Sequence, residues 1–512
     1  MDYATNIEKD GRQKEITRKG YVIPKSMFNS DELMKIKEEL TAKPFKCGNY
    51  SKSTVNIQFP LYEEDNDRLI IPRFFGIKKF GEPEINELEE YKYPEFNMVY
   101  NGELRPHQKT IVDKVFKGFE KDKGGLLIAG CGSGKTNMAI YIACHYKMKT
   151  LFIVNKGFLK NQVVNRILST TNLEEVGIIQ QNKVNVDPPF VVGMVQSLSS
   201  REYDEEIFQD FGMIIIDEVH HMGAKVFSRV YRKIGAKYML GITAERKRND
   251  RMYKIITWNM GPILHFEEQK PNNMVVVKKF FYKTSNRDRI KLVLNKFTHE
   301  PDRSTMITNL IFIKKRNKFI LKLIENLYDQ GKNILCLTGR LKQVDLFYNI
   351  LNDYSCFKNN IGKYIGRMSE KELSKSATKQ IIFGTYCMAE EGLDIENLNV
   401  VILCTPKSAI KQSVGRILRK EVYEEHPIVI DLVDVDNEIF HRQSNVRNNY
   451  YKKQNYNIQE FQVSDYEIKK YMLWNDEEKI KKALLLTTRK REKKERQNYL
   501  GPIDCNDIQF LD

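Results

Sequence analysis

The sequence predicts an α/β protein with two tandem parallel-sheet domains, a small N-terminal domain and a basic C-terminal tail. Short apolar segments rich in Val and Ile recur in two blocks, separated by helical or loop segments, as expected for strands buried on both faces of a parallel sheet. The length of 512 residues suits two to four domains. Hydrophobic residues make up 41% and charged residues 29%, values typical of a globular protein.

The predicted domain boundaries follow these two blocks. We expect an N-terminal accessory domain over 1–95, a first sheet domain over 96–265, a polar and basic connector over 266–303, a second sheet domain over 304–455 and a C-terminal extension over 456–512. The strands expected in the two sheets are Gly125–Ala129, Leu151–Val154, Phe190–Met194, Met213–Ile216, Tyr238–Ile242, Ile334–Thr338, Gln380–Thr385, Val400–Cys404 and Ile428–Val433.

Charge and cysteine usage narrow the class of protein. The net charge of +16 favours a polyanionic partner such as nucleic acid, although general solubility explains the charge equally well. The eight cysteines are scattered without a CxxC pair or a zinc-like cluster, which is typical of reduced thiols. No apolar run approaches the roughly 20 residues that span a bilayer, and residues 1–13 lack the apolar stretch of a secretory signal. We therefore expect an intracellular protein without a membrane partner.

A glycine-rich segment follows the first predicted strand and precedes a predicted helix over Asn137–Tyr146. Its residues are Ala129, Gly130, Cys131, Gly132, Ser133, Gly134, Lys135 and Thr136. In a Walker A loop the glycines let backbone amides surround a phosphate, Lys135 adds a point charge and the Thr136 hydroxyl holds Mg²⁺. A simple glycine-rich turn is the alternative, and the strand and helix on either side favour the nucleotide site.

An acidic pair follows another predicted strand. Met213–Ile216 leads directly into Asp217 and Glu218, so both carboxylates lie at the carboxyl end of a strand, where open α/β sheets bind ligands. Asp217 would hold Mg²⁺ through water, and Glu218 would orient and deprotonate the attacking water. Such a pair is commonly a helix cap, but its combination with Lys135 favours catalysis.

Two arginines lie in the second block. Arg416 and Arg419 are three residues apart, which predicts that they share one helical face. Their guanidinium groups could stabilise negative charge on the γ-phosphate, as arginine fingers do. A solvated basic helix end is the alternative, and the preceding Gln412 and Gly415 favour the finger.

At this point the chain resembles the DExH group of superfamily 2 helicases over about residues 98–440. The resemblance implies two RecA-like domains, ATP and Mg²⁺ as ligands, hydrolysis of ATP and binding of nucleic acid. It assigns adenine reading to Gln108, nucleic-acid contact to Gln196 and Ser197, and coupling to Thr243, Ala244 and Gln412. It also places His220 in the acidic motif, and it places Gly392 and Asp394 beside the nucleotide or the nucleic-acid strand.

One motif departs from this group. Glu245 stands where a threonine is usual, and Arg246 replaces the following proline, so we expect a less rigid loop with ATP binding unaffected. Arg246 and Asp250 approximate the group's downstream Arg and Asp.

A narrower resemblance rests on 362–366, 380–395 and 429–434, with 19–24, 40–41 and 71–76 in the N-terminal part. These segments resemble helicases of large cytoplasmic DNA viruses, including the poxvirus transcript-release type, and the related UvsW and XPB group. This implies action on DNA, with 3′ to 5′ movement, in transcript release or repair, in the virion or a cytoplasmic viral factory, with the nucleus as alternative. We favour a monomer that works with transcription or repair machinery. The open alternatives are an RNA helicase, a nucleotide-gated clamp or remodeller that separates no strands, and a restriction-type translocating subunit.

Overall fold

The computed structural model describes residues 13–44, 58–130, 132–245, 252–267, 274–366, 368–392, 395, 397–418, 425–464 and 471–472. The chain divides into two compact units, Met1–Glu268 and Gln269–Asp512, and each is described by itself. Within the described parts, helices are too short or too polar to cross a membrane.

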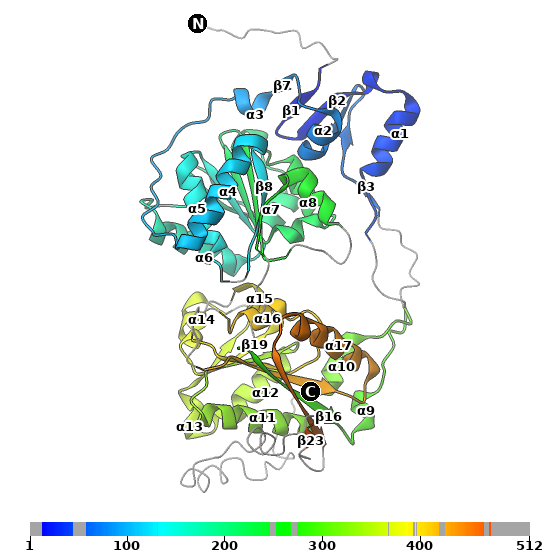
Figure 1. Cartoon of the computed structure of the whole chain (residues 1–512), viewed down its shortest axis with the longest axis vertical. Coiled ribbons are helices and arrows are strands. Elements are labelled where there is room, and N and C mark those ends of the chain that lie inside the picture. The colour runs from blue at the N-terminus through cyan, green and yellow to red at the C-terminus, as the bar shows by residue number, and fades with distance from the viewer. Residues whose placement is uncertain are drawn as a thin grey trace. The chain divides into compact units, whose positions relative to one another are not determined.

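The N-terminal part of the first unit forms a small five-stranded sheet, β5-β6-β2-β1-β7 (Figure 1). Its strands are β1 (Glu15–Thr17), β2 (Gly20–Pro24), β5 (Glu63–Glu64), β6 (Arg68–Ile71) and β7 (Ile85–Asn86). Its helices are α1 (Ser30–Glu39), α2 (Arg73–Phe80) and α3 (Glu87–Glu90), and β3 (Thr41–Ala42) pairs with β4 (Phe59–Pro60). Helix α2 crosses β2 so closely that a Cβ at Gly76 would lie 2.2 Å from the Tyr21 ring.

The main sheet of the first unit has the order β11-β10-β12-β9-β13-β14-β8-β15. Every neighbouring pair is parallel except β10 with β11. The strands are β8 (Gly124–Ile128), β9 (Thr150–Val154), β10 (Gly177–Gln180), β11 (Lys183–Asn185), β12 (Phe190–Met194), β13 (Met213–Asp217), β14 (Tyr238–Thr243) and β15 (Ile263–Phe266). The helices are α4 (Pro106–Asp122), α5 (Lys135–Tyr146), α6 (Gly157–Thr170), α7 (Val195–Ser200) and α8 (Tyr253–Met260).

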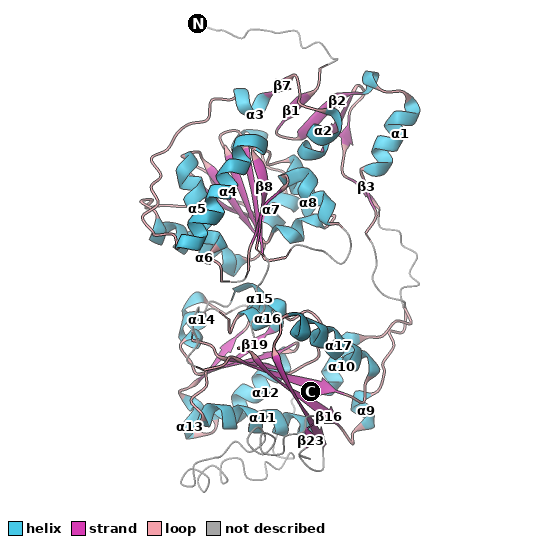
Figure 2. Cartoon of the chain, viewed as in Figure 1, coloured by secondary structure: helices cyan, strands magenta, loops and turns pink. Residues whose placement is uncertain are grey.

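Alternate residues of these strands enter two different hydrophobic clusters, one on each face of the sheet. Ile214 and Ile216 belong to one cluster, whereas Met213 and Ile215 belong to the other. Helices flank both parallel sheets of the chain (Figure 2). Because both faces are covered, the strands are apolar throughout, which is the pattern that predicted them.

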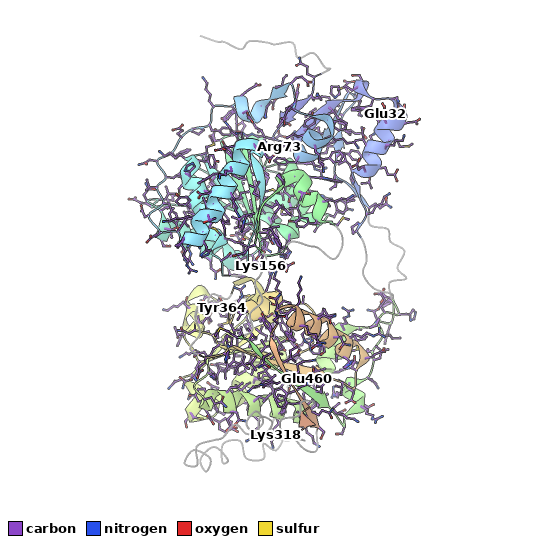
Figure 3. The ribbon with its side chains drawn as sticks, in the orientation of Figure 1. Glu32, Arg73, Lys156, Lys318, Tyr364 and Glu460 are labelled. Carbon is purple, nitrogen blue, oxygen red and sulfur yellow. The ribbon has the colours of Figure 1, made fainter. Side chains whose placement is uncertain are left out.

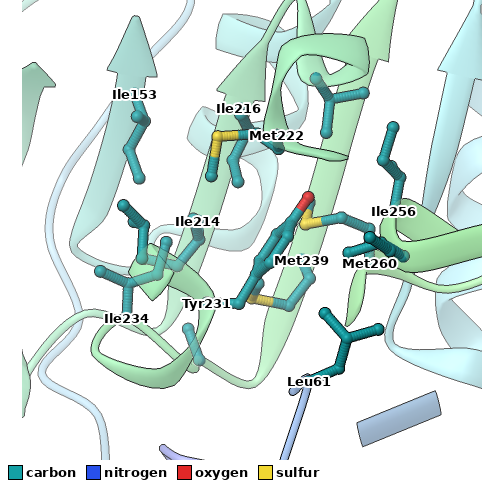
Figure 4. Close-up of a cluster of buried hydrophobic side chains, with 14 of the residues drawn as sticks. Leu61, Ile153, Ile214, Ile216, Met222, Tyr231, Ile234, Met239, Ile256 and Met260 are labelled. Atoms are coloured by element: carbon teal, nitrogen blue, oxygen red, sulfur yellow. The ribbon is translucent and has the colours of Figure 1, made fainter. Parts of the chain in front are cut away.

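The small N-terminal sheet shares its core with the main sheet. Figure 4 shows Leu61 in the same cluster as Ile214, Met239 and Met260. The buried Arg73, labelled in Figure 3, donates from Nη1 to the carbonyl oxygens of Ala236 (3.0 Å) and Lys237 (3.2 Å). The described residues of the predicted 1–95 domain therefore contain their own sheet but share a hydrophobic cluster with the first sheet domain.

The second unit is a parallel sheet of order β18-β19-β17-β20-β21-β16-β22, with β23 added antiparallel at the edge. Its strands are β16 (Val276–Lys283), β17 (Ile334–Thr338), β18 (Ile361–Tyr364), β19 (Ile381–Thr385), β20 (Val400–Leu403), β21 (Ile428–Asp434), β22 (Asn457–Ser464) and β23 (Tyr471–Met472). Its helices are α9 (Arg287–Ile290), α10 (Arg303–Leu310), α11 (Lys314–Asp329), α12 (Leu341–Asn352), α13 (Ser355–Lys358), α14 (Glu370–Ala377), α15 (Tyr386–Gly392), α16 (Lys411–Gly415) and α17 (Glu438–Lys453).

The predicted fold class is confirmed, and all nine predicted strands form within one residue of their predicted bounds. The predicted connector over 266–303 is wrong in its extent, because β16 lies within the second sheet between β21 and β22. The predicted extension over 456–512 likewise contributes β22 to that sheet. The basic tail over 481–496 lies outside the described residues.

Candidate active site

The glycine-rich loop connects β8 to α5 and bends sharply through two glycines. Gly132 and Gly134 have φ angles of 81° and 82°, in the left-handed region that favours glycine. Helix α5 begins at Lys135, two residues earlier than predicted, so Lys135 and Thr136 lie in its first turn. An anion placed at this helix end would meet free backbone amides and the positive end of the helix dipole.

The Lys135 ammonium group is folded back onto its own loop. Its Nζ donates to the carbonyl oxygens of Ala129 (3.0 Å) and Gly130 (2.9 Å). A second contact brings a carboxylate to the loop, because the Gly130 amide donates to Oε2 of Glu267 at 3.3 Å. Glu267 directly follows β15, and no local sequence signal predicts this contact because 137 residues separate the partners.

Gln108, in α4, forms a hydrogen bond with the glycine-rich loop. Its Nε2 donates to the Ser133 carbonyl oxygen at 2.9 Å, and its Oε1 accepts from the Arg105 amide at 2.9 Å. The side chain is buried, with 3% of its surface exposed. Adenine reading by Gln108 stays a prediction, and the contacts present here fix the position of the loop relative to α4.

The acidic pair lies at the end of β13. The Glu218 amide donates to Oδ1 of Asp217 at 2.9 Å, and Glu218 itself adopts a left-handed backbone with φ 45° and ψ 47°. Burial and the charge of Glu218 raise the pKa of Asp217 to about 7, against an opposing effect of Lys135. Burial also raises the pKa of Glu218, but the hydrogen bond with His220 and the charge of Lys135 outweigh burial and lower that pKa to about 2.

Strand β14 brings the predicted coupling residues to the acidic pair, because β14 lies between β13 and β8. Thr243 Oγ1 lies 2.9 Å from His220 Nδ1 and donates to Glu218 Oε2 at 3.4 Å. His220 Nδ1 also lies 3.2 Å from Glu218 Oε2. The buried Ala244 follows Thr243. Glu218, His220 and Thr243 therefore form one contact network.

Glu245, the residue that departs from the family pattern, lies next to this network. Its backbone amide donates to Thr243 Oγ1 at 3.0 Å, and its Oε2 lies 3.9 Å from His220 Nε2. The His220 ring thus faces a carboxylate on each side, Glu218 at Nδ1 and Glu245 at Nε2.

The predicted nucleic-acid contacts Gln196 and Ser197 follow β12, at the same edge of the sheet. Gln196, in the first turn of α7, donates from Nε2 to the Asn155 carbonyl oxygen. Ser197 is 5% exposed, and its Oγ accepts from the Gln181 amide at 2.9 Å. Lys156, labelled in Figure 3, precedes α6 as its N-cap. The protein contacts of Gln196 and Ser197 hold the loops together at this edge.

The second unit holds the remaining predicted residues. Gln412 lies in α16, which ends at Gly415, and Arg416 is its C-cap. Helix α16 stops before Arg416, at a glycine that disfavours helix, and the prediction that Arg416 and Arg419 share a helical face stays a prediction. Gly392 is the last residue of α15. Arg419, Asp394, Cys131, Arg246 and Asp250 lie outside the described residues.

The donor set at the loop suits Mg²⁺ bound together with a nucleotide. Among the described residues there is no group of three or more His, Cys, Asp or Glu side chains that could hold a metal ion. Proteins usually hold Mg²⁺ through one or two carboxylates together with substrate phosphates and water. Thr136 and Asp217 fit that pattern, since the charge of Lys135 reaches the half-buried Asp217 carboxylate and couples the two segments.

A phosphate loop after β8 and an acidic pair at the end of β13, two strands separated by β14 in a parallel sheet, define a nucleotide hydrolase. The family described as "Type III restriction enzyme, res subunit" matches residues 101–248. The "Putative ATP-dependent RNA helicase L396" of Acanthamoeba polyphaga mimivirus is 57% identical to this chain, over 97% of this chain and 98% of that protein. The chain therefore belongs to the superfamily 2 helicases of viral type and is an ATP-hydrolysing enzyme, which confirms the predicted class.

More distant relatives are also viral. The "Putative helicase 161L" of Invertebrate iridescent virus 6 is 24% identical, over 71% of this chain and 84% of that protein. The "Transcript termination protein A18" of Yaba monkey tumor virus is 23% identical, over 64% of this chain and 72% of that protein. Among solved structures, T4 UvsW aligns with a TM-score of 0.32 and 18% identity, over 85% of this chain and 96% of that chain.

Proposed function

We propose that this helicase translocates on DNA and releases transcripts during viral transcription. The observation that carries the proposal is the similarity to the Yaba monkey tumor virus protein named for transcript termination, which extends over 355 residues. The net charge of +16 supports a nucleic-acid partner. The site of action would be the infected cell, in a viral factory or the virion, with transcription machinery as partner.

We assign the chemistry to residues of both units. Lys135 and the loop amides would bind the β- and γ-phosphates, and Thr136 and Asp217 would hold Mg²⁺, which neutralises charge on the phosphates when bound. Glu218, whose lowered pKa keeps it ionised, would accept a proton from the attacking water. Arg416 and Arg419 would stabilise negative charge on the γ-phosphate.

Thr243 and His220 would transmit the state of the nucleotide to the strand-binding loops. Both contact Glu218, and Thr243 also joins the acidic pair to the segment that follows β14. A change at the γ-phosphate would therefore alter contacts at the carboxyl ends of several strands. Gln412 would have the corresponding role in the second unit.

The second candidate substrate is RNA, because the mimivirus relative at 57% identity is named as an RNA helicase. Phosphate contacts alone do not distinguish the two sugars. The test measures ATP turnover of the full chain with single-stranded DNA, duplex DNA and RNA of the same sequence, side by side. We expect DNA to stimulate turnover more than RNA, and stimulation by RNA alone would contradict the DNA proposal. Lys135→Ala, which removes the charge that meets the phosphates, is the inactive control.

A further inference from the structure

A projecting loop in the second unit carries an almost fully exposed aromatic side chain. We call residues 291–302 the tip loop; it joins α9 to α10 (Figure 1). Phe297 lies in this loop with 93% of its surface exposed. The motifs that identify the helicase family do not include this segment, so the ATP site gives it no role.

The base of the tip loop is anchored in a hydrophobic cluster. Ile290, at the end of α9, is 4% exposed and packs with Met306, Leu310, Ile313 and Phe440, and Val293 packs against the same cluster. The Asn437 Nδ2 group donates to the Ile290 carbonyl oxygen at 2.8 Å. The loop is therefore attached to the body of the second unit at its base.

The far end of the loop is closed by hydrogen bonds around Asn295. The Asn295 amide donates to the Glu300 carbonyl oxygen (2.8 Å), and the His299 amide donates to the Asn295 carbonyl oxygen (2.9 Å). Oδ1 of Asn295 accepts from the amides of Phe297 (2.9 Å) and Thr298 (3.1 Å). These bonds fix the backbone of Phe297, so presenting its ring costs little additional conformational entropy.

Most of the exposed side chains of the tip loop are apolar or basic. Leu292 and Leu294 are 56% and 49% exposed, whereas Val293 between them packs against the cluster at the base. Lys291 and Lys296 are also exposed, and Lys296 directly precedes Phe297. An aromatic ring next to a lysine suits single-stranded nucleic acid, since every base offers a π-face and every linkage a phosphate. The cores of protein interfaces, in contrast, are depleted in lysine.

We propose that Phe297 stacks on a base of single-stranded DNA while Lys296 contacts a neighbouring phosphate, so that the tip loop is a nucleic-acid contact outside the helicase motifs. The choice of DNA rests on the function proposed above. Nucleic acid is the expected partner because the chain is a helicase. The exposed ring, the hydrogen-bonded backbone and the adjacent lysine are the features that suit stacking on a base next to a phosphate.

The experiment measures binding of the full chain to a DNA oligonucleotide and to the same oligonucleotide with abasic sites, at fixed salt. Phe297→Ala should weaken binding to the normal oligonucleotide about tenfold, the order expected for loss of one stacked base. It should leave binding to the abasic oligonucleotide unchanged, because phosphate contacts survive. Phe297→Trp should restore binding, and its fluorescence should be quenched by the normal oligonucleotide only. Val446→Ala, at a 53% exposed position on α17, is the matched control and should bind as the wild type does.

The outcomes separate this proposal from the proposed substrate. Wild-type chain that binds DNA, with Phe297→Ala binding equally well, would overturn the tip contact and leave the DNA assignment intact. Wild-type chain that binds RNA but not DNA would overturn both. Equal losses on the normal and abasic oligonucleotides would show that Phe297 does not stack on a base. If Phe297→Ala binds DNA as the wild type does but no longer binds a protein partner, the tip loop is a protein contact instead.

Discussion

Gly134→Ala tests whether Gln108 sets the position of the phosphate loop. At φ 82° an alanine costs about 1–2 kcal/mol of backbone strain. Its Cβ would lie 2.1 Å from Gln108 Nε2, so the hydrogen bond from Gln108 to Ser133 must break, at a further cost of about 1 kcal/mol. If nucleotide binding requires the present loop conformation, a total of about 2–3 kcal/mol lowers ATP affinity roughly 30- to 150-fold.

Equilibrium binding of a fluorescent ATP analogue measures this loss of affinity. A double-mutant cycle separates the contribution of backbone strain from that of the lost Gln108 hydrogen bond. Gln108→Ala removes the atom that the new Cβ would meet, so adding Gly134→Ala to that background should cost only the strain. The two changes should therefore couple by about 1 kcal/mol. Gly331→Ala, at φ 72° with open space around it, is the strain control in the second unit and should bind nucleotide normally. An equal cost of Gly134→Ala with and without Gln108 would refute the role given to Gln108.

The remaining predictions concern the acidic network and one buried ion pair. Glu245→Thr should remove the carboxylate that faces His220 Nε2. The pH profile of kcat should therefore shift, while the KM for ATP stays near the wild-type value. A changed KM with an unshifted pH profile of kcat would contradict this. The raised pKa of Asp217 is about 7. Turnover of ATP at limiting Mg²⁺ should therefore fall as the pH drops through that value and the carboxylate protonates. A flat profile of turnover from pH 8 to 6 would count against Asp217 as a Mg²⁺ ligand. Asp434→Asn should destabilise the second unit by about 3–5 kcal/mol, because it leaves the fully buried Arg316 without its carboxylate partner. In the wild-type chain Arg316 Nε lies 2.7 Å from Asp434 Oδ1. An unchanged midpoint of thermal unfolding would refute this prediction.

The strands of both sheets could be predicted because each is apolar on both faces. The segment 266–303 is polar and basic overall, which predicts a connector, yet Val276–Lys283 within it forms β16. Lys279 is nevertheless 3% exposed, and its Nζ donates to Glu460 Oε1 (3.0 Å) and Asn448 Oδ1 (3.2 Å). These partners lie 181 and 169 residues away, so local sequence could not show that this lysine would be satisfied inside the sheet.

The same limit applies to the active site. The phosphate loop and the acidic pair have local signatures, and the structure places Glu218 and His220, which follow β13, beside Thr243 at the end of the neighbouring strand β14. The contact between Glu267 and the Gly130 amide has no local signature, because it depends on β15 pairing with β8. The helical face predicted for Arg416 and Arg419 stays a prediction, because α16 ends at Gly415 and Arg419 lies outside the described residues.

Single-turnover ATP hydrolysis by Glu218→Gln, compared with the wild-type chain in the presence of single-stranded DNA, tests the assignment of the catalytic base most directly. Glutamine keeps the shape of the side chain but cannot accept the proton from water. The assignment predicts that nucleotide binding persists, that the hydrolysis step slows by a factor of about 100 or more, and that the variant stays bound to DNA in the presence of ATP. Hydrolysis at the wild-type rate would show that Glu218 is not the base.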